Sequence, residues 1–140
     1  MDIDKFNVEG YYDPTAYEAV TKIEREAKKL EFKALVYICS PYAGDTERNT
    51  RRAQGYSRFA VSRGVIPIAP HLLFPQFMDD SDKQERTRAI LMGLVLISKC
   101  KEVWRFGNKI SEGMAAEIDF AKRHGITVRC FNDRCEELRK

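Results

Sequence analysis

Short apolar runs alternate with helical segments from about residue 34 to residue 131, and this alternation constrains the fold more than any other feature of the sequence. The β-rich runs lie at residues 34–39, 65–69, 102–106 and 126–131. The segments between them, residues 48–63, 83–99 and 111–124, carry apolar residues at helical spacing. Parallel strands need helical crossovers of this length, and such crossovers cover both faces of a sheet. The pattern therefore predicts a single α/β domain with a flavodoxin- or Rossmann-like three-layer fold and a mainly parallel sheet of four to five strands.

The two ends of the chain depart from this alternation. Residues 1–32 are expected to form an N-terminal helical extension, because Asp13-Pro14 is typical of a helix start and apolar residues recur at helical spacing up to Leu30. Residues 33–140 are expected to form the α/β domain, which closes with a short helix at residues 135–140.

Composition excludes several classes of protein. The 24 basic and 21 acidic residues leave a net charge of +3, a balance too even to indicate a nucleic-acid polymer as partner. Arg48, Arg51 and Arg52 are nevertheless able to meet a single phosphate. No apolar run approaches a membrane span and no signal-peptide pattern is present, which predicts a cytoplasmic protein. The four cysteines lack paired C-x-x-C spacing, so they are expected to be free thiols with no metal site, and Cys39 and Cys100, in apolar runs, are expected to be buried.

Glu117 is the leading candidate for chemistry. On a helix, the neighbours of Glu117 lie three and four positions away. They are Gly113, Met114, Phe120 and Ala121, none of which carries a charge that could pair with the carboxylate. Asp119, in contrast, has Lys122 and Arg123 within one turn. An unpaired carboxylate on the apolar side of a helix is costly unless it serves a ligand or a cation. A structural salt bridge from Glu117 to Arg105 or Lys101 is the alternative that the sequence leaves open.

The loops that follow the strands supply the candidate binding residues, because ligands of open α/β sheets bind beyond the carboxyl ends of the strands. Ser111 is a good helix cap after a glycine-containing loop, an arrangement that suits an anion but also suits a plain capped helix. His71 lies among apolar residues, either to stack on a flat base or as an ordinary loop histidine. The loop at residues 40–45, after the first strand, has neither the G-x-x-x-x-G-K-S/T nor the G-x-G-x-x-G pattern, which argues against triphosphate-loop and dinucleotide-binding proteins.

Several motifs carry a resemblance to a known family. They are Ser40-Pro41-Tyr42, Pro67-x-Ala69-Pro70-His71, and Trp104-x-Phe106-Gly107 followed by Ile110-Ser111-x-Gly113-Met114-x-x-Glu117-Ile118. On these residues the region 34–131 resembles the nucleoside 2-deoxyribosyltransferase-like superfamily, and more closely its DUF4406-type proteins.

The resemblance implies roles for particular residues. Glu117 matches the glutamate that attacks the anomeric carbon, Ser111 matches a serine near the 5′-phosphate, and Tyr42 is expected to orient the glutamate or the sugar. The substrate-binding residues that we predict are Ser40, Pro41, Ala43, Gly44, His71, Phe106, Gly107, Ser111, Gly113 and Met114. The superfamily usually has an aspartate at the end of the preceding strand, whereas residues 103–106 here contain no acid. A homo-oligomer is implied too, with no cofactor.

The sequence thus predicts an N-glycosidase or deoxyribosyltransferase-like enzyme that acts on a nucleoside or nucleoside monophosphate, with Glu117 as nucleophile and no metal. A nucleotide-binding or sensing protein that keeps the pocket without turnover is the alternative that the missing strand-end aspartate favours. A third interpretation, a structural or interaction domain, requires Glu117 to be buried against a cation with no adjoining pocket.

Overall fold

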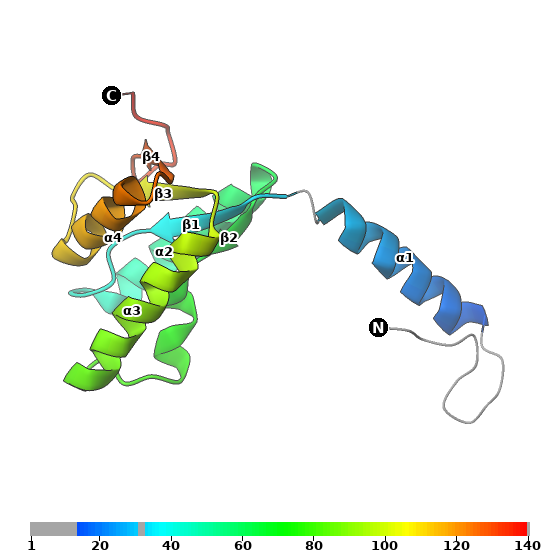
Figure 1. The fold of residues 1–140 in the computed structure, drawn as a ribbon, viewed down its shortest axis with the longest axis horizontal. Coiled ribbons are helices and arrows are strands. Elements are labelled where there is room, and N and C mark those ends of the chain that lie inside the picture. The colour runs from blue at the N-terminus through cyan, green and yellow to red at the C-terminus, as the bar shows by residue number, and fades with distance from the viewer. Residues whose placement is uncertain (1–13, 31–32, 140) are drawn as a thin grey trace. The chain divides into compact units, whose positions relative to one another are not determined.

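The computed structural model describes residues 14–30 and 33–139, and the chain divides into two compact units, residues 1–33 and 34–140. The first unit contains helix α1, Pro14–Leu30, which confirms the predicted leading helix (Figure 1). Proline begins this helix, where its missing N–H is not needed, and two lysines lie in its last turn. No described helix is long and apolar enough to cross a membrane.

The second unit is built on a parallel sheet, as predicted. Its strands are β1 Leu35–Cys39, β2 Ile66–Ile68, β3 Glu102–Phe106 and β4 Thr127–Phe131. Their order in the sheet is β2-β1-β3-β4, and every neighbouring pair runs parallel. Each strand is β-rich and short, and helices connect them along the chain.

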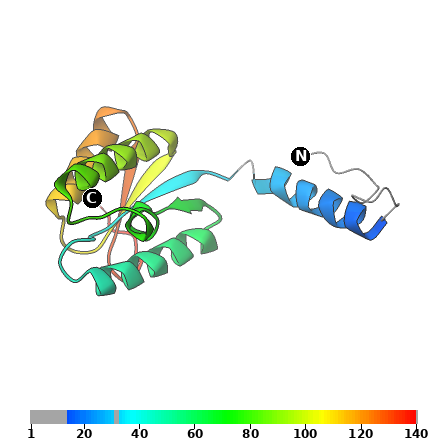
Figure 2. The ribbon, with the colours of Figure 1, turned by 90° about the horizontal axis from the view of Figure 1, so that it is seen from below.

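Three helices cover the two faces of the sheet: α2 Thr46–Ser62, α3 Lys83–Lys99 and α4 Glu112–Arg123. Figure 2 shows α2 on one face and α3 with α4 on the other. Side chains alternate along β1, so Val36 and Ile38 pack with α2 whereas Tyr37 and Cys39 pack with α3 and α4. Two separate apolar clusters result, one on each face, and the three-layer prediction is confirmed.

Each of these helices begins at a side chain that caps it. The carboxylates of Asp45 and Asp82 accept hydrogen bonds from the first backbone N–H groups of α2 and α3. The Ser111 hydroxyl does the same for the N–H of Met114 in α4. The helix starts are therefore determined locally, which is why the sequence predicts them to within two residues.

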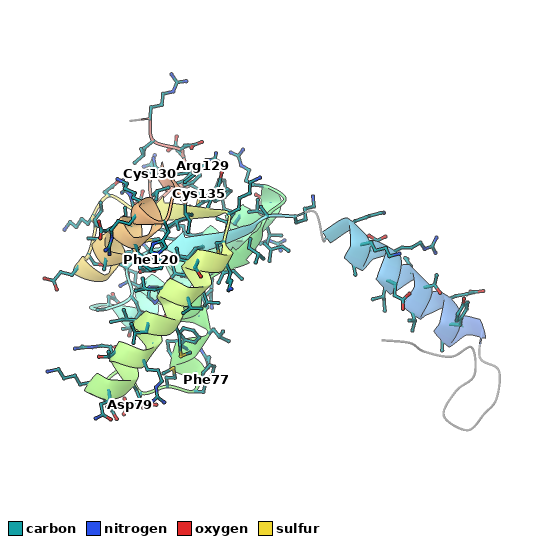
Figure 3. The ribbon with its side chains drawn as sticks, in the orientation of Figure 1. Phe77, Asp79, Phe120, Arg129, Cys130 and Cys135 are labelled. Atoms are coloured by element: carbon teal, nitrogen blue, oxygen red, sulfur yellow. The ribbon has the colours of Figure 1, made fainter. Side chains whose placement is uncertain are left out.

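The predicted closing helix at residues 135–140 is wrong over its described part, residues 135–139. The Asn132 side chain accepts from the N–H groups of Arg134 and Glu136, and the chain turns back on itself. The returning segment pairs antiparallel with β4, through a bridge between Phe131 and Glu137. Figure 3 labels Arg129 of β4, whose guanidinium lies 2.7 Å from the Glu137 carboxylate.

Helix α3 has the predicted bounds, but only part of its inner side is as the sequence predicts. The apolar spacing predicts that Ile90, Leu91, Leu94, Val95 and Ser98 face the core. Leu94 does pack against the core beside buried Gly93 and Ile97, whereas Ile90, Leu91 and Val95 are exposed. Apolar residues surround much of this helix, so the packing of its neighbours decides which side turns inward.

Candidate functional site

The strand order creates a natural binding position between β1 and β3. The chain leaves β1 toward β2 on one side, and reaches β3 on the other side through α3. The loops that follow β1 and β3 therefore diverge, and such a topological switch point is where open α/β sheets bind ligands. A cavity of about 420 Å³ lies there. It is lined by Ser40, Pro41, Arg48, Asn49, Arg52, Tyr56, Gly107, Asn108, Lys109 and Asp133.

The loop after β1 is held by helix α2. The Asn49 side-chain amide donates to the carbonyl oxygens of Tyr42 and Ala43, each at 3.1 Å. Gly44 has a φ of +96°, a conformation that favours glycine, and Asp45 then caps α2. This loop is thus an ordered wall of the cavity.

The loop after β3 is held by the sheet itself. Gly107 has a φ of +100°, and its N–H donates to the Phe131 carbonyl at 3.0 Å. The Arg105 guanidinium donates to the Gly107 carbonyl at 2.6 Å. Asn108 and Lys109, which follow this turn, are exposed on the opposite wall of the cavity from α2.

Glu117 lies on the other face of the sheet, where α4 packs against β1. Its side chain is partly buried, and Oε2 has no hydrogen-bond partner among the described residues. Burial raises the pKa of Glu117 from its ordinary value of 4.5 to about 7, and the nearby Tyr37 hydroxyl opposes this shift. No ion pair within the described ranges involves Glu117, and Arg105 donates to a backbone carbonyl instead. The predicted alternative of a structural salt bridge therefore finds no support.

Tyr37 is a neighbour of Glu117 that the sequence did not single out. It lies within β1, and its hydroxyl is in hydrogen-bonding reach of the Glu117 carboxylate. Burial and the Glu117 charge together raise the pKa of Tyr37, which keeps the phenol protonated and able to donate. Its position in an apolar strand looks like an ordinary core position, so no local signal separates it from its neighbours.

Gly93 of α3 makes room for the Tyr37 hydroxyl. A Cβ atom at Gly93 would lie 3.2 Å from that hydroxyl oxygen, closer than an ordinary van der Waals contact. Cys39, also on this face, has its pKa raised by burial and by the Glu117 charge. These side chains form a compact polar group between the sheet, α3 and α4.

Tyr42 and His71 contact each other. Their rings stack at 5.0 Å between centroids with an interplanar angle of 21°. The His71 Nε2 lies 3.1 Å from the Ser40 carbonyl oxygen, which can only accept, so Nε2 carries the proton. Burial lowers the pKa of His71, although the Ser40 hydrogen bond opposes that shift. Both residues support the loop after β1 rather than line the cavity.

Comparison with known proteins places the chain in a family. Residues 34–131 match the family described as Domain of unknown function (DUF7768). The chain belongs to the DUF7768 family. The motifs suggested a closer likeness to DUF4406-type proteins, but the family that matches is DUF7768. No curated protein matches this sequence.

Among solved structures, this DUF7768 protein resembles a 2-deoxyribosyltransferase from the psychrotolerant bacterium Bacillus psychrosaccharolyticus. The TM-score is 0.60 at 17% identity, over 71% of this chain and 72% of the other. A 2-deoxyribosyltransferase from Leishmania mexicana is similar with a TM-score of 0.49 at 17% identity, over 71% of this chain and 64% of the other. At this identity the likeness to the Bacillus enzyme shows a shared fold, which agrees with the α/β fold expected from the sequence.

In the DUF7768 protein, the predicted site residues fall into separate groups. Ser40, Pro41 and Gly107, three of the residues predicted to bind substrate, line the cavity. Ala43 and Gly44 are exposed in the loop behind it, and Phe106 is fully buried in the core beside Tyr56. The other predicted residues also do not line the cavity: Glu117, Tyr42, His71, Ser111, Gly113 and Met114.

Around the start of α4, local structure accounts for the predicted residues of the DUF7768 protein. The Ser111 hydroxyl caps the helix, Gly113 is exposed, and Met114 is buried against Cys39, whose thiol donates to its carbonyl oxygen at 3.9 Å. Asn49, Tyr56, Asn108, Lys109 and Asp133, which were not predicted, line the cavity instead. Asn49, Arg52 and Tyr56 recur along α2 at spacings of three and four residues, and Arg48 lies four residues before Arg52, a signal that would have grouped them.

Proposed function

We propose that this DUF7768 protein is an N-glycosidase or deoxyribosyltransferase-like enzyme that acts on a nucleoside or nucleoside monophosphate. The observation that carries the proposal is Glu117, a partly buried carboxylate with one oxygen free of any partner in the described structure. Helix α4 presents it beside the Tyr37 hydroxyl, within a fold that resembles a 2-deoxyribosyltransferase.

The proposed reaction uses the Glu117 carboxylate as nucleophile. A carboxylate oxygen bonds to the anomeric carbon while the glycosidic C–N bond breaks, and the base leaves with the bonding electrons and takes a proton from solvent. Water, or a second base, then displaces the glutamate from the resulting ester. The hydrogen bond from Tyr37 stabilises the ionised carboxylate, because it opposes the rise in the Glu117 pKa that burial causes.

A nucleotide-binding or sensing protein is a second candidate that specific observations favour. Glu117 does not line the cavity: it lies beside Tyr37, on the face that α3 and α4 cover, whereas the cavity includes Tyr56 of α2. The end of β3 carries no acid that could protonate a departing base. Asp79 and Asp82, the acids of the segment before α3, already have structural roles: Asp79 accepts a hydrogen bond from Ser81, and Asp82 caps α3. In Figure 3, Asp79 lies near the start of α3 together with Phe77.

The proposal includes assembly into a homo-oligomer. Its support is a set of large apolar side chains that are exposed in this chain and lie on α3 and the segment before it: Leu73, Phe77, Ile90, Leu91 and Val95. Light scattering coupled to size-exclusion chromatography measures the mass directly. A monomer at micromolar concentration would remove this part of the proposal. Cytoplasmic location also remains a prediction.

The decisive experiment is a chromatographic assay for free base with a panel of nucleosides and nucleoside monophosphates. The wild-type protein is compared with Glu117→Gln, and with Asp119→Asn as a matched control on the exposed side of the same helix. Base released by the wild type and the control, but not by Glu117→Gln, supports the enzyme. Tight binding without release supports the sensing protein, and release that survives Glu117→Gln rules out this nucleophile.

A further inference from the structure

The cavity at the switch point gathers positive charge. Arg48 and Arg52 are one helical turn apart on α2, and Lys109, from the loop after β3, lines the same cavity. None of the three forms an ion pair within the described parts of the chain. Arg51, the intervening arginine, points elsewhere and pairs with Glu47 at 3.4 Å. Asp133 is the carboxylate that lines the same cavity, so three cations meet one anion there.

Ser40 supplies a second and independent observation. It lines the same cavity, it is only 2% exposed, and its Oγ has no hydrogen-bond partner among the described residues. A buried hydroxyl without a partner is unfavourable, and native proteins rarely keep one that serves no ligand or water.

The walls that carry these groups are held in place. Asn49 fixes the loop that begins at Ser40, and the Gly107 N–H is bonded to β4 at the base of the loop that carries Lys109. Tyr56 is stacked on Phe106 at 4.3 Å between centroids, which fixes the floor of the cavity. Bound ligand therefore meets cations and a hydroxyl donor whose supporting backbone is already ordered.

We propose that this cavity binds a phosphate group, as inorganic phosphate or as the phosphate of a phosphate monoester. Arg48, Arg52 and Lys109 neutralise the charge, because guanidinium forks match phosphate oxygens and an ammonium adds a further donor. The Ser40 hydroxyl donates one more hydrogen bond. Asp133 lines the same cavity, and its carboxylate is suited to accept a hydrogen bond from a hydroxyl group of a phosphate monoester. This site holds whether or not Glu117 cleaves a glycosidic bond.

The test is calorimetric titration of the full chain, in low-chloride buffer, with three probes: inorganic phosphate, a deoxynucleoside 5′-monophosphate and the parent deoxynucleoside. Each is repeated with Arg52→Gln, Arg48→Gln and the matched control Arg51→Gln. Loss of one cavity arginine is expected to weaken binding of both phosphate-bearing probes about tenfold or more, a typical effect for one charge-assisted hydrogen bond. The control is expected to match the wild type.

Ser40→Ala separates binding from folding. Because the free protein loses only an unsatisfied hydroxyl, its melting temperature is expected to stay the same or rise, while phosphate affinity falls severalfold. A substitution that merely damaged the fold would lower both.

The outcomes distinguish this proposal from the proposed function. A monophosphate that binds far more tightly than inorganic phosphate identifies the ligand as a monoester, and equal affinities identify free phosphate. If neither phosphate-bearing probe binds, or if Arg51→Gln weakens binding as much as Arg52→Gln, the site is wrong even when base release by Glu117 is observed. Phosphate binding without base release removes only the enzymatic proposal.

Discussion

Burial makes the Glu117 carboxyl group harder to ionise, so the free energy of unfolding depends on pH through this group. Its pKa in the folded protein is about 7, against an ordinary 4.5, which means that the folded protein holds this proton more tightly than the unfolded chain. The free energy of unfolding therefore falls as pH rises from about 4.5 to about 7, and the loss is complete above pH 7. The 2.5-unit difference between these two pKa values corresponds to about 3 kcal/mol.

We expect Glu117→Gln to remove this pH dependence. Relative to the wild type, the variant gains stability as pH rises from 5 to 8, by up to about 3 kcal/mol, because it never has to bury a charge. Urea denaturation of both proteins at the two pH values measures the difference. Other titrating groups cancel in the comparison, so parallel pH profiles would show that Glu117 keeps an ordinary pKa.

Tyr37→Phe tests the partner of that carboxylate. The Tyr37 hydroxyl opposes the rise in the pKa of Glu117, so its removal is expected to move that pKa further above 7. Carbon-13 NMR of the labelled glutamate carboxyl group follows the titration. Tyr42→Phe is the control and should leave the titration unchanged, since Tyr42 stacks on His71. The reverse result would restore the role that the sequence analysis gave to Tyr42.

Gly93 of helix α3 leaves space for the Tyr37 hydroxyl because it has no side chain. Alanine in place of an interior helical glycine normally adds about 0.5–1 kcal/mol of stability. At Gly93 the added methyl group would lie 3.2 Å from the Tyr37 hydroxyl oxygen, whereas at Gly55 of α2 it would meet nothing within 4 Å. Two glycines in 17-residue helices thus differ mainly in what their added Cβ would contact.

We expect Gly55→Ala to be stabilising by about 0.5–1 kcal/mol and Gly93→Ala to gain clearly less, or to lose stability. In Gly93→Ala the displaced hydroxyl also raises the pKa of Glu117, as in Tyr37→Phe. Denaturant midpoints and the same carboxyl titration provide both readouts. Equal gains for the two variants would mean that Tyr37 moves aside freely.

The whole chain consists of two units, and both apolar core clusters belong to the second. All their members lie between Leu35 and Cys135. We propose that residues 33–140 form an independent domain and residues 1–32 an extension. A fragment that begins at residue 33 is expected to unfold in one cooperative transition and to keep the near-ultraviolet circular dichroism of its buried aromatic cluster. A broad, non-cooperative transition would contradict this division.

The positions of the elements and the fold class followed from local patterns in the sequence. The periods of 2 and 3.6 residues predicted the strands and helices, capping residues such as Ser111 marked the helix starts, and crossovers of this length required a parallel sheet. The sequence also singled out Glu117, because a lack of charged neighbours on a helix is a local property.

Tertiary structure alone decided what surrounds these residues. Contacts between distant segments place Tyr37 beside Glu117, turn Ile90 outward, and return residues 135–139 along β4. The cavity likewise combines α2 with the loops after β1 and β3, and Glu117 does not line it. No sequence period encodes such pairings, because they arise when each side chain packs against whichever neighbours the sheet order brings near it.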